Sequence, residues 1–218
     1  MGEPFRFYSR LYLTELTGLK AGDLRGLLGN LKTLPESSIY YHTHRFLQQH
    51  HYLSPEPPND FAYWIRNILQ EEEVGERIAS VDTIQFTSIE DLRRKFIGII
   101  EDYMERTGKN PDAPEGYEFH FMKAITFVIP TPHYALSLKE FYEIMQRVSV
   151  HSIYYHMFEA RLRLKRETND FSNWLEGQLG EKEMAERITR LDPYTHTLEG
   201  LRRRILAIAK RRLDAQDR

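Results

Sequence analysis

The 218-residue sequence contains no cysteine, which excludes disulfide bonds, thiolate nucleophiles and metal sites with cysteine ligands. It has no apolar run of about 18 residues, so no membrane-spanning helix is expected. The glycine-rich phosphate loops, the G-x-S-x-G elbow and the H-E-x-x-H zinc motif are also missing. We therefore expect a cytoplasmic protein that holds no cofactor, and we favour a protein without catalytic activity.

The composition predicts a folded chain with little net charge. Hydrophobic residues make up 41% of the sequence, which is enough for a buried core, and the formal net charge is −2. This charge argues against a nucleic-acid partner, although a basic run near the C-terminus could bind one with strongly salt-dependent affinity. We interpret that run as the solvated face of a terminal helix. It consists of Arg202, Arg203, Arg204, Lys210, Arg211 and Arg212.

A five-residue motif occurs twice. Ser38–His42 (Ser-Ile-Tyr-Tyr-His) reappears unchanged 114 residues later as Ser152–His156. Such repeats predict two homologous copies of one unit of about a hundred residues. We place the first copy at residues 1–105, a linker at 106–116 and the second copy at 117–218. Three further pairs of matching segments support this division: Asn59–Trp64 with Asn169–Trp174, Glu76–Ile78 with Glu186–Ile188, and Leu92–Arg94 with Leu201–Arg203.

Each copy begins with alternating apolar residues. Phe5 and Phe7 in the first copy correspond to Phe119 and Phe121 in the second, and this spacing predicts a short, half-buried extended segment. We expect Ile129–Pro132 to end the second segment, because proline cannot donate a ladder hydrogen bond. A single strand is not stable alone, so the two segments should pair with each other or lie across helices.

The remainder of each copy has the apolar spacing of helices. Asp23 and Ser137 are expected to cap the first helix of each copy, and Asp60 and Asp170 to cap the short helices that carry Phe-x-x-Trp. The first copy has extra residues around 50–58, which predict a surface loop. The predicted fold is therefore mainly α, with two homologous helical repeats related by a pseudo-two-fold axis. Each repeat would have one short N-terminal extended segment.

The repeated Tyr-Tyr-His motif allows two interpretations. Its histidines could be enclosed by Trp64 or Trp174, with their ring nitrogens satisfied by hydrogen bonds. Alternatively, partly exposed histidines and tyrosines could line a pocket, close to the Asn-Asp pairs that begin the following helices. The candidate ligand-binding residues are Tyr40, Tyr41, His42, Asn59, Asp60, Tyr154, Tyr155, His156, Asn169 and Asp170.

A metal site is the sharper hypothesis, but we assign no metal ligands. His156 and Glu159 are spaced to chelate one ion on a helix. The residue that matches Glu159 in the first copy is Arg45, which cannot bind a metal ion. A site that joins His42 and His156 remains open. The leading hypothesis is a non-catalytic interaction or regulatory module with a small-molecule pocket and an unknown protein or small-molecule partner. The alternative is a metal- or carboxylate-dependent enzyme that acts on a small molecule such as a sugar derivative.

The order of the motifs resembles that of a known family. Ser-Ile-Tyr-Tyr-His, then Asn-Asp-Phe-x-x-Trp, then Ala185–Tyr194 and Leu-x-x-Leu-Arg are similar to the DUF5752 family, a bacterial and archaeal domain of uncharacterised function. The resemblance covers most of the second copy, whereas the first departs from it at Val81–Ile84. It implies no particular reaction, and it points to sugar metabolism.

Overall fold

The computed structural model describes residues 2–49, 59–191 and 196–216. The surface loop that the sequence predicts at 50–58 lies outside these residues. Contacts divide the chain into two compact units. The His42 unit comprises Tyr12–Gln49 and the described residues from Asn59 to Ile125. The His156 unit comprises the residues up to Leu11 and those from Thr126 onward.

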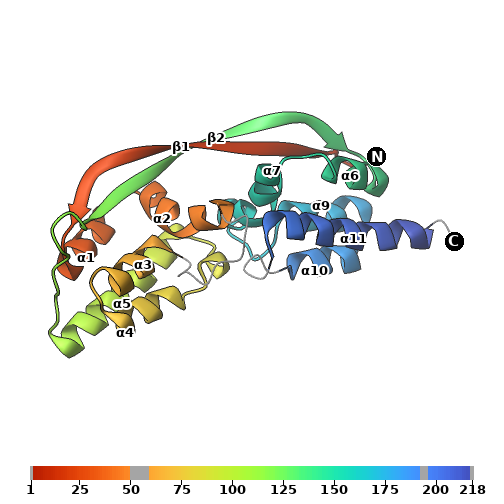
Figure 1. Cartoon of the computed structure of the whole chain (residues 1–218). Coiled ribbons are helices and arrows are strands. Elements are labelled where there is room, and N and C mark those ends of the chain that lie inside the picture. Colours follow the sequence, from red (N-terminus) through yellow and green to blue (C-terminus); the bar gives the residue numbers. More distant parts are fainter. Residues whose placement is uncertain (1, 50–58, 192–195, 217–218) are drawn as a thin grey trace. The chain divides into compact units, whose positions relative to one another are not determined.

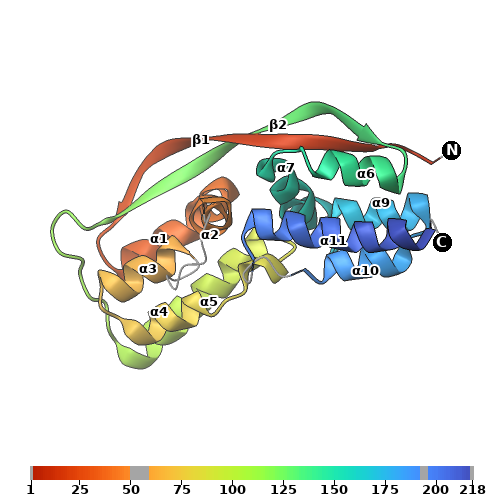
Figure 2. The same ribbon diagram turned by 45° about the vertical axis from the view of Figure 1, so that its right-hand side comes forward.

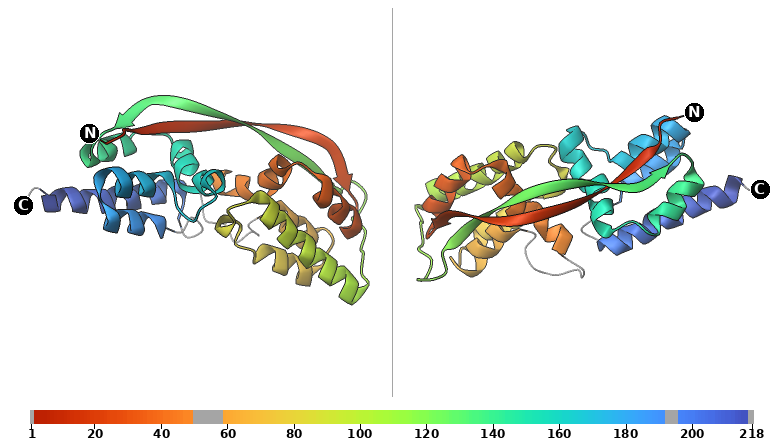
Figure 3. Two further views of the ribbon diagram at one scale, coloured as in Figure 1. Left: turned by 180° about the vertical axis from the view of Figure 1, so that it is seen from behind. Right: turned by 90° about the horizontal axis from the view of Figure 1, so that it is seen from above.

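Two long strands form a two-stranded antiparallel sheet. Strand β1 covers Phe5–Ala21 and strand β2 covers Phe119–Ala135, and the views in Figures 1 and 3 show the two ribbons running side by side. The Thr17 hydroxyl donates to the Phe121 carbonyl, and the Thr131 hydroxyl donates to the Phe7 carbonyl, both at 2.7 Å. The prediction that the extended segments pair with each other is confirmed.

The prolines do not end β2, which continues through Pro130 and Pro132 to Ala135. Both strands of a two-stranded sheet are edge strands, and every second residue of a strand directs its backbone nitrogen away from the partner strand. Pro130 and Pro132 are two residues apart, so both nitrogens lie on the same edge. Proline is tolerated on the outer edge because no donor is needed there.

Helices complete the two units, and Figure 2 shows them from a second direction. The sequence favours helices here because the apolar residues recur with a period near 3.6. The helices of the His42 unit are α1 (Leu24–Thr33), α2 (Glu36–Gln49), α3 (Asp60–Asn67), α4 (Glu72–Ala79), the 3₁₀ turn η1 (Thr83–Gln85) and α5 (Ile89–Thr107). Those of the His156 unit are α6 (Leu138–Met145), α7 (Val150–Tyr154), the π-helical turn η2 (Tyr155–Glu159), α8 (Ala160–Leu164), α9 (Asp170–Leu179), α10 (Lys182–Thr189) and α11 (Leu198–Gln216).

The start of β2 completes the core of the His42 unit. Phe119 stacks on Phe61 of α3 with ring centroids 5.2 Å apart, and Phe121 is fully buried beside it. Burying such rings is the main stabilising term of a core, at about 25 cal/mol per Å² of apolar surface. The strand residues that complete this core belong to the second of the two copies that the sequence predicts.

The start of β1 completes the core of the His156 unit in the same manner. Phe5 lies 5.3 Å from Phe171 of α9, and Phe7 stacks on Phe141 of α6 at 5.9 Å, measured between ring centroids. These strand residues belong to the first of the two copies that the sequence predicts. Each core therefore combines helices of one predicted copy with strand residues of the other.

The predicted fold class is consequently wrong. Among the described residues 59% are helical and 18% lie in strands, which makes this an α/β fold instead of a mainly α pair of repeats. The extended segments are not short, because each strand has 17 residues. The period-2 pattern identified the buried start of each strand but missed the exposed remainder, where no alternation is required. The predicted boundaries at 105 and 117 stay a prediction.

Buried and exposed phenylalanines of β2 provide a direct test of this core. We expect Phe121→Ala to lower the free energy of unfolding by about 3–5 kcal/mol, because a buried ring leaves a cavity. The matched Phe127→Ala variant removes a ring that is 48% exposed and should cost no more than about 0.5 kcal/mol. Urea denaturation measures both values, and equal losses would contradict the described packing.

Candidate functional site

The two motif histidines are both buried. His42 on α2 is 3% exposed and His156 in η2 is 2% exposed. Aromatic rings surround them: Phe119 lies 4.8 Å from His42 and Phe5 lies 4.9 Å from His156, between ring centroids. Of the two interpretations of the motif, burial of the histidines agrees with enclosed rings and not with partly exposed ones.

One nitrogen of each imidazole pairs with a carboxylate. His42 Nδ1 lies 2.8 Å from Asp60 Oδ2, and His156 Nδ1 lies 2.7 Å from Asp170 Oδ2. The sequence placed the Asn-Asp pairs close to the histidines, and the structure brings Asp60 and Asp170 to them. A carboxylate in this position fixes the orientation and the tautomer of the ring.

Asparagine, not aspartate, caps the helices that present these carboxylates. Asn59 Oδ1 accepts the Ala62 N–H at 2.8 Å, and Asn169 Oδ1 accepts the Ser172 N–H at 2.8 Å. The prediction that Asp60 and Asp170 are the caps is wrong by one residue. Because the asparagine side chains satisfy the first free N–H groups of the helices, the aspartates at the next position can reach the histidines.

The other nitrogen of each imidazole accepts a hydrogen bond from a strand. The Met122 N–H donates to His42 Nε2 at 3.0 Å, and the Tyr8 N–H donates to His156 Nε2 at 2.9 Å. An acceptor nitrogen carries no proton, so both rings are neutral with the proton on Nδ1. Neither ring has a free lone pair with which to bind a metal or to remove a proton from a substrate.

In the His42 unit the serine of the motif also forms a hydrogen bond with the strand. Ser38 and His42 are four residues apart and lie on the same face of α2. The Ser38 hydroxyl donates to the Met122 carbonyl at 2.6 Å, so one helix face satisfies both backbone groups of one strand residue. In the His156 unit the corresponding Ser152 hydroxyl is buried without a hydrogen-bond partner among the described residues.

The motif tyrosines serve different purposes. Tyr154 is fully buried, Tyr41 is buried, and Tyr40 stacks on His44 with ring centroids 5.0 Å apart. Tyr155 lines a cavity, and the Arg163 guanidinium lies 4.8 Å from its ring centre. Burial raises the pKa of the Tyr155 hydroxyl above its ordinary value of 10.0.

A cavity of about 650 Å³ lies beside His156. From the candidate residues it brings together Tyr155, His156 and Asp170, whereas Tyr154 and Asn169 do not line it. Sequence reasoning named Trp174 of α9 as a neighbour of the histidine, and this residue lines the cavity together with Asn173. It missed Arg6, Tyr8 and Arg163, because their positions depend on the path of β1 and on the end of α8.

Asp170 is the centre of a short polar chain at this cavity. Its Oδ2 accepts from Arg163 Nη2 at 2.6 Å as well as pairing with His156. In the His42 unit Gln49 stands where the match of Arg163 would be, and Asp60 is exposed. In both motifs the histidine Nε2 thus accepts a hydrogen bond from the strand. The motifs differ at the aspartate, because Asp170 also pairs with an arginine whereas the residue that matches this arginine in the His42 unit is a glutamine.

The described residues contain no group of three potential metal ligands. Glu159, which the sequence placed one turn from His156, forms a buried ion pair with Arg10 of β1 instead. His156 lies within the π-helical turn η2, and such turns occur often where a helix positions a special side chain. Within the described residues no helix is long and apolar enough to cross a membrane.

The serine contacts predict unequal effects of one substitution in the two motifs. Ser38→Ala should lower the free energy of unfolding by about 1–3 kcal/mol, because it leaves the Met122 carbonyl unsatisfied. Ser152→Ala removes a hydroxyl that has no partner and should be nearly neutral. Guanidinium denaturation of both variants measures the difference, and a larger loss for Ser152→Ala would contradict the assignment.

The environment of His156 predicts a loss of stability in acid. Burial lowers the pKa of this imidazole below its ordinary value of 6.5, and the hydrogen bond to Asp170 opposes the shift only in part. As the pH falls below 6.5, the unfolded chain therefore binds this proton before the folded chain does. The contribution of His156 to stability is complete above that pH and decreases below it.

We expect His156→Gln to flatten the decline of the unfolding free energy below pH 6.5. Exposed His120 supplies the matched control, and an equal flattening in His120→Gln would show that the effect does not come from the buried ring. If His156→Gln does not fold, an NMR titration of the wild-type imidazole gives its pKa directly. A value above 6.5 would contradict the burial of a neutral ring.

Comparisons with known proteins show the family of the chain. No curated protein matches it. "The structure of OrfY from Thermoproteus tenax" is similar to it with a TM-score of 0.80 and 25% sequence identity, over 96% of this chain and 95% of that chain. A single match to the sequence profile of DUF5752, described as a family of unknown function, covers residues 2–210 and so includes both Tyr-Tyr-His motifs. The chain belongs to the DUF5752 family.

Proposed function

We propose that this chain is a non-catalytic interaction or regulatory module of the cytoplasm. The observation that carries the proposal is that His42 Nε2 and His156 Nε2 both accept backbone hydrogen bonds. A histidine–aspartate pair resembles the core of a catalytic site, but a general base needs a lone pair directed at the substrate. Here the strands occupy both lone pairs, so the motif is better suited to hold the fold together than to perform a reaction.

The strand surface of the His42 unit supports a docking role. Leu13 is 61% exposed and Leu16 is 65% exposed, and Leu19 and Ile125 are exposed as well. A soluble protein seldom leaves several large apolar side chains of one element in water, because each contributes to binding when a partner covers it.

The strand surface of the His156 unit has the same character. Phe127, Val128 and Ile129 are consecutive and all exposed, as is Leu11 on β1. Consecutive strand residues point to opposite faces, so both faces of β2 are apolar and open here. Such a segment is typical of a surface that another protein covers, and we propose a protein partner for it.

The cavity beside Tyr155 is the small-molecule part of the proposal. Tyr8, Tyr155 and Trp174 provide aromatic walls, and Arg163 and Asp170 provide charged hydrogen-bonding groups. Aromatic faces with a few polar groups are suited to a neutral ligand that carries hydroxyl groups. Binding there would act on the contact between Tyr8 and His156 and hence on the start of β1.

A carboxylate-dependent enzyme is the second candidate, and the position of Asp170 at this cavity favours it. Against it, the Asp170 carboxylate already pairs with His156 and with Arg163. These partners hold the carboxylate in one orientation and occupy its Oδ2 atom, so that this oxygen is not directed at a substrate. Stoichiometric transition metal in tag-free protein, lost in His156→Ala, would favour the enzyme and contradict the module.

Photo-crosslinking in cells of the native organism tests the docking surface. A photoreactive amino acid in place of Leu13 should give one adduct of fixed mass with a second protein, because this position lies on the apolar strand surface. The same group in place of Glu105, an exposed residue of α5 in the same unit, serves as the control. Leu16→Lys should lower the yield at position 13 by about tenfold, which corresponds to roughly 1.4 kcal/mol.

Equal labelling from positions 13 and 105 would contradict a specific surface. An adduct with the mass of two copies of the chain would mean that the surface binds a second copy of this chain and not a different protein.

A further inference from the structure

Four arginines surround a groove between α10 and α11, two helices that lie side by side in Figure 2. Arg187 and Arg190 come from α10 and its C-terminal cap, and Arg204 and Arg211 come from α11. The groove has a volume of about 280 Å³. Its described lining contains no carboxylate, and its floor consists of Leu191, Ala207 and Ile208.

These arginines have few interactions that would neutralise them. Among the described residues Arg187 and Arg211 make no ion pair or hydrogen bond. Arg190 has only a loose contact of 3.7 Å with Glu186, and Arg204 Nε donates to His196 Nε2 at 3.2 Å. Four like charges around one groove repel one another, so the arrangement is unfavourable unless an anion binds there.

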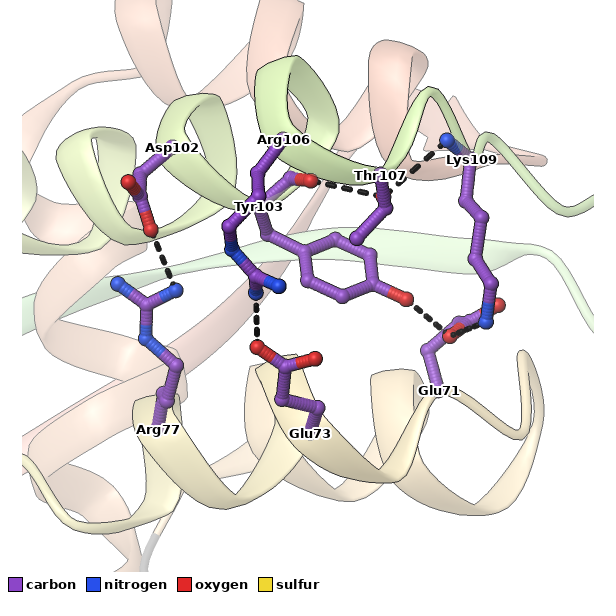
Figure 4. Close-up of polar contacts among 8 residues, drawn as sticks. All are labelled: Glu71, Glu73, Arg77, Asp102, Tyr103, Arg106, Thr107 and Lys109. Atoms are coloured by element: carbon purple, nitrogen blue, oxygen red, sulfur yellow. Dashed lines mark hydrogen bonds and ion pairs between the residues drawn. The ribbon is translucent and has the colours of Figure 1, made fainter.

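In the His42 unit the corresponding helices are α4 and α5. There the arginine that matches Arg187 is neutralised by a carboxylate. The matched motifs relate Arg187 to Arg77, 110 residues earlier, and Arg211 to Asp102, 109 residues earlier. Arg77 Nη1 and Asp102 Oδ2 form an ion pair at 2.6 Å between α4 and α5 (Figure 4). One aspartate there takes the position that Arg211 holds in α11.

One more substitution adds positive charge to the groove of the His156 unit. Ser80 stands where Arg190 has its match, whereas Lys95, which matches Arg204, is already a cation. Both line the corresponding cavity between α4 and α5. That cavity also contains Asp82, so its cations Arg77 and Lys95 share it with a carboxylate. The residue that matches Asp82 is Asp192, which lies outside the described residues.

Not every contact between α10 and α11 has lost the carboxylate that its counterpart between α4 and α5 has. In Figure 4 Glu71 accepts from Tyr103 and from Lys109 between α4 and α5. The match of Glu71 is Glu181, which pairs with Arg212 Nε at 2.7 Å. A carboxylate contact is therefore retained at the start of α10, whereas the charged side chains among the described residues of the groove are all cationic.

We propose that this groove binds a small molecule that carries a phosphate group. A guanidinium is planar and always charged, and it can donate two parallel hydrogen bonds to phosphate oxygens. Four such groups match the multiple charge of a phosphate ester better than that of a single carboxylate. The apolar floor under the arginines would contact the organic part of the ligand.

Calorimetric titration with inorganic pyrophosphate tests the site in the full chain. We expect one pyrophosphate per chain and an affinity that weakens as the salt concentration rises. Arg211→Asp should weaken binding by roughly tenfold or more, because the new carboxylate would pair with Arg187 as Asp102 pairs with Arg77. Arg211→Gln, which removes one cation without adding a carboxylate, should have a smaller effect.

Arg203→Asp provides the matched control, since it makes the same change of charge on an exposed residue of α11 outside the groove. It should change the affinity by less than about twofold at moderate salt. The reverse substitution, Asp102→Arg, should release Arg77 and create a second pyrophosphate site between α4 and α5. Circular dichroism confirms that each variant is folded.

Three results would overturn the proposal: no binding of pyrophosphate at millimolar concentration, equal losses in Arg211→Asp and Arg203→Asp, or displacement of pyrophosphate by a much tighter single-stranded RNA. The last result would assign the groove to nucleic acid, as the basic run of the sequence alone could suggest.

Discussion

The fold depends on a hydrogen bond that occurs once in each unit, from a strand N–H group to a buried histidine. Each strand start lies in a core made of helices distant in sequence, and its backbone groups lose their contact with water there. A buried N–H without an acceptor costs about 1–3 kcal/mol. His42 supplies the acceptor for Met122, and His156 supplies it for Tyr8. The paired aspartates keep both rings in the tautomer that this contact requires.

This constraint also determines what the protein can offer to other molecules. Because the imidazoles are held in the cores, the most reactive side chains of the motif are not available for chemistry. The accessible features of the described residues include the apolar surface of β1 and β2, the cavity beside Tyr155 and the basic groove between α10 and α11. These three are suited to binding, which agrees with an interaction or regulatory module.

Sequence patterns predicted the local features of this structure and missed those that depend on distant residues. Asp23 and Ser137 cap their helices as expected, because capping involves residues only three positions apart. The role of Asp60 was misjudged by one residue, since a cap and a partner for His42 compete for the same side chain. The length of β1, the passage of β2 through Pro130 and the assignment of strand starts to opposite copies depend on long-range pairing. Similarly, no local signal distinguishes Arg211 from a solvated arginine until Arg77 and Asp102 are seen together.

The protonation of the motif histidines tests the central claim most directly. Long-range ¹⁵N–¹H NMR spectra of the folded chain at pH 7.5 distinguish a protonated ring nitrogen from an acceptor nitrogen. The structure predicts that His42 and His156 both have the proton on Nδ1 and a free-base Nε2, and that the Met122 and Tyr8 amides exchange slowly with solvent. A proton on Nε2 of either ring, together with rapid exchange of the corresponding strand amide, would contradict the account.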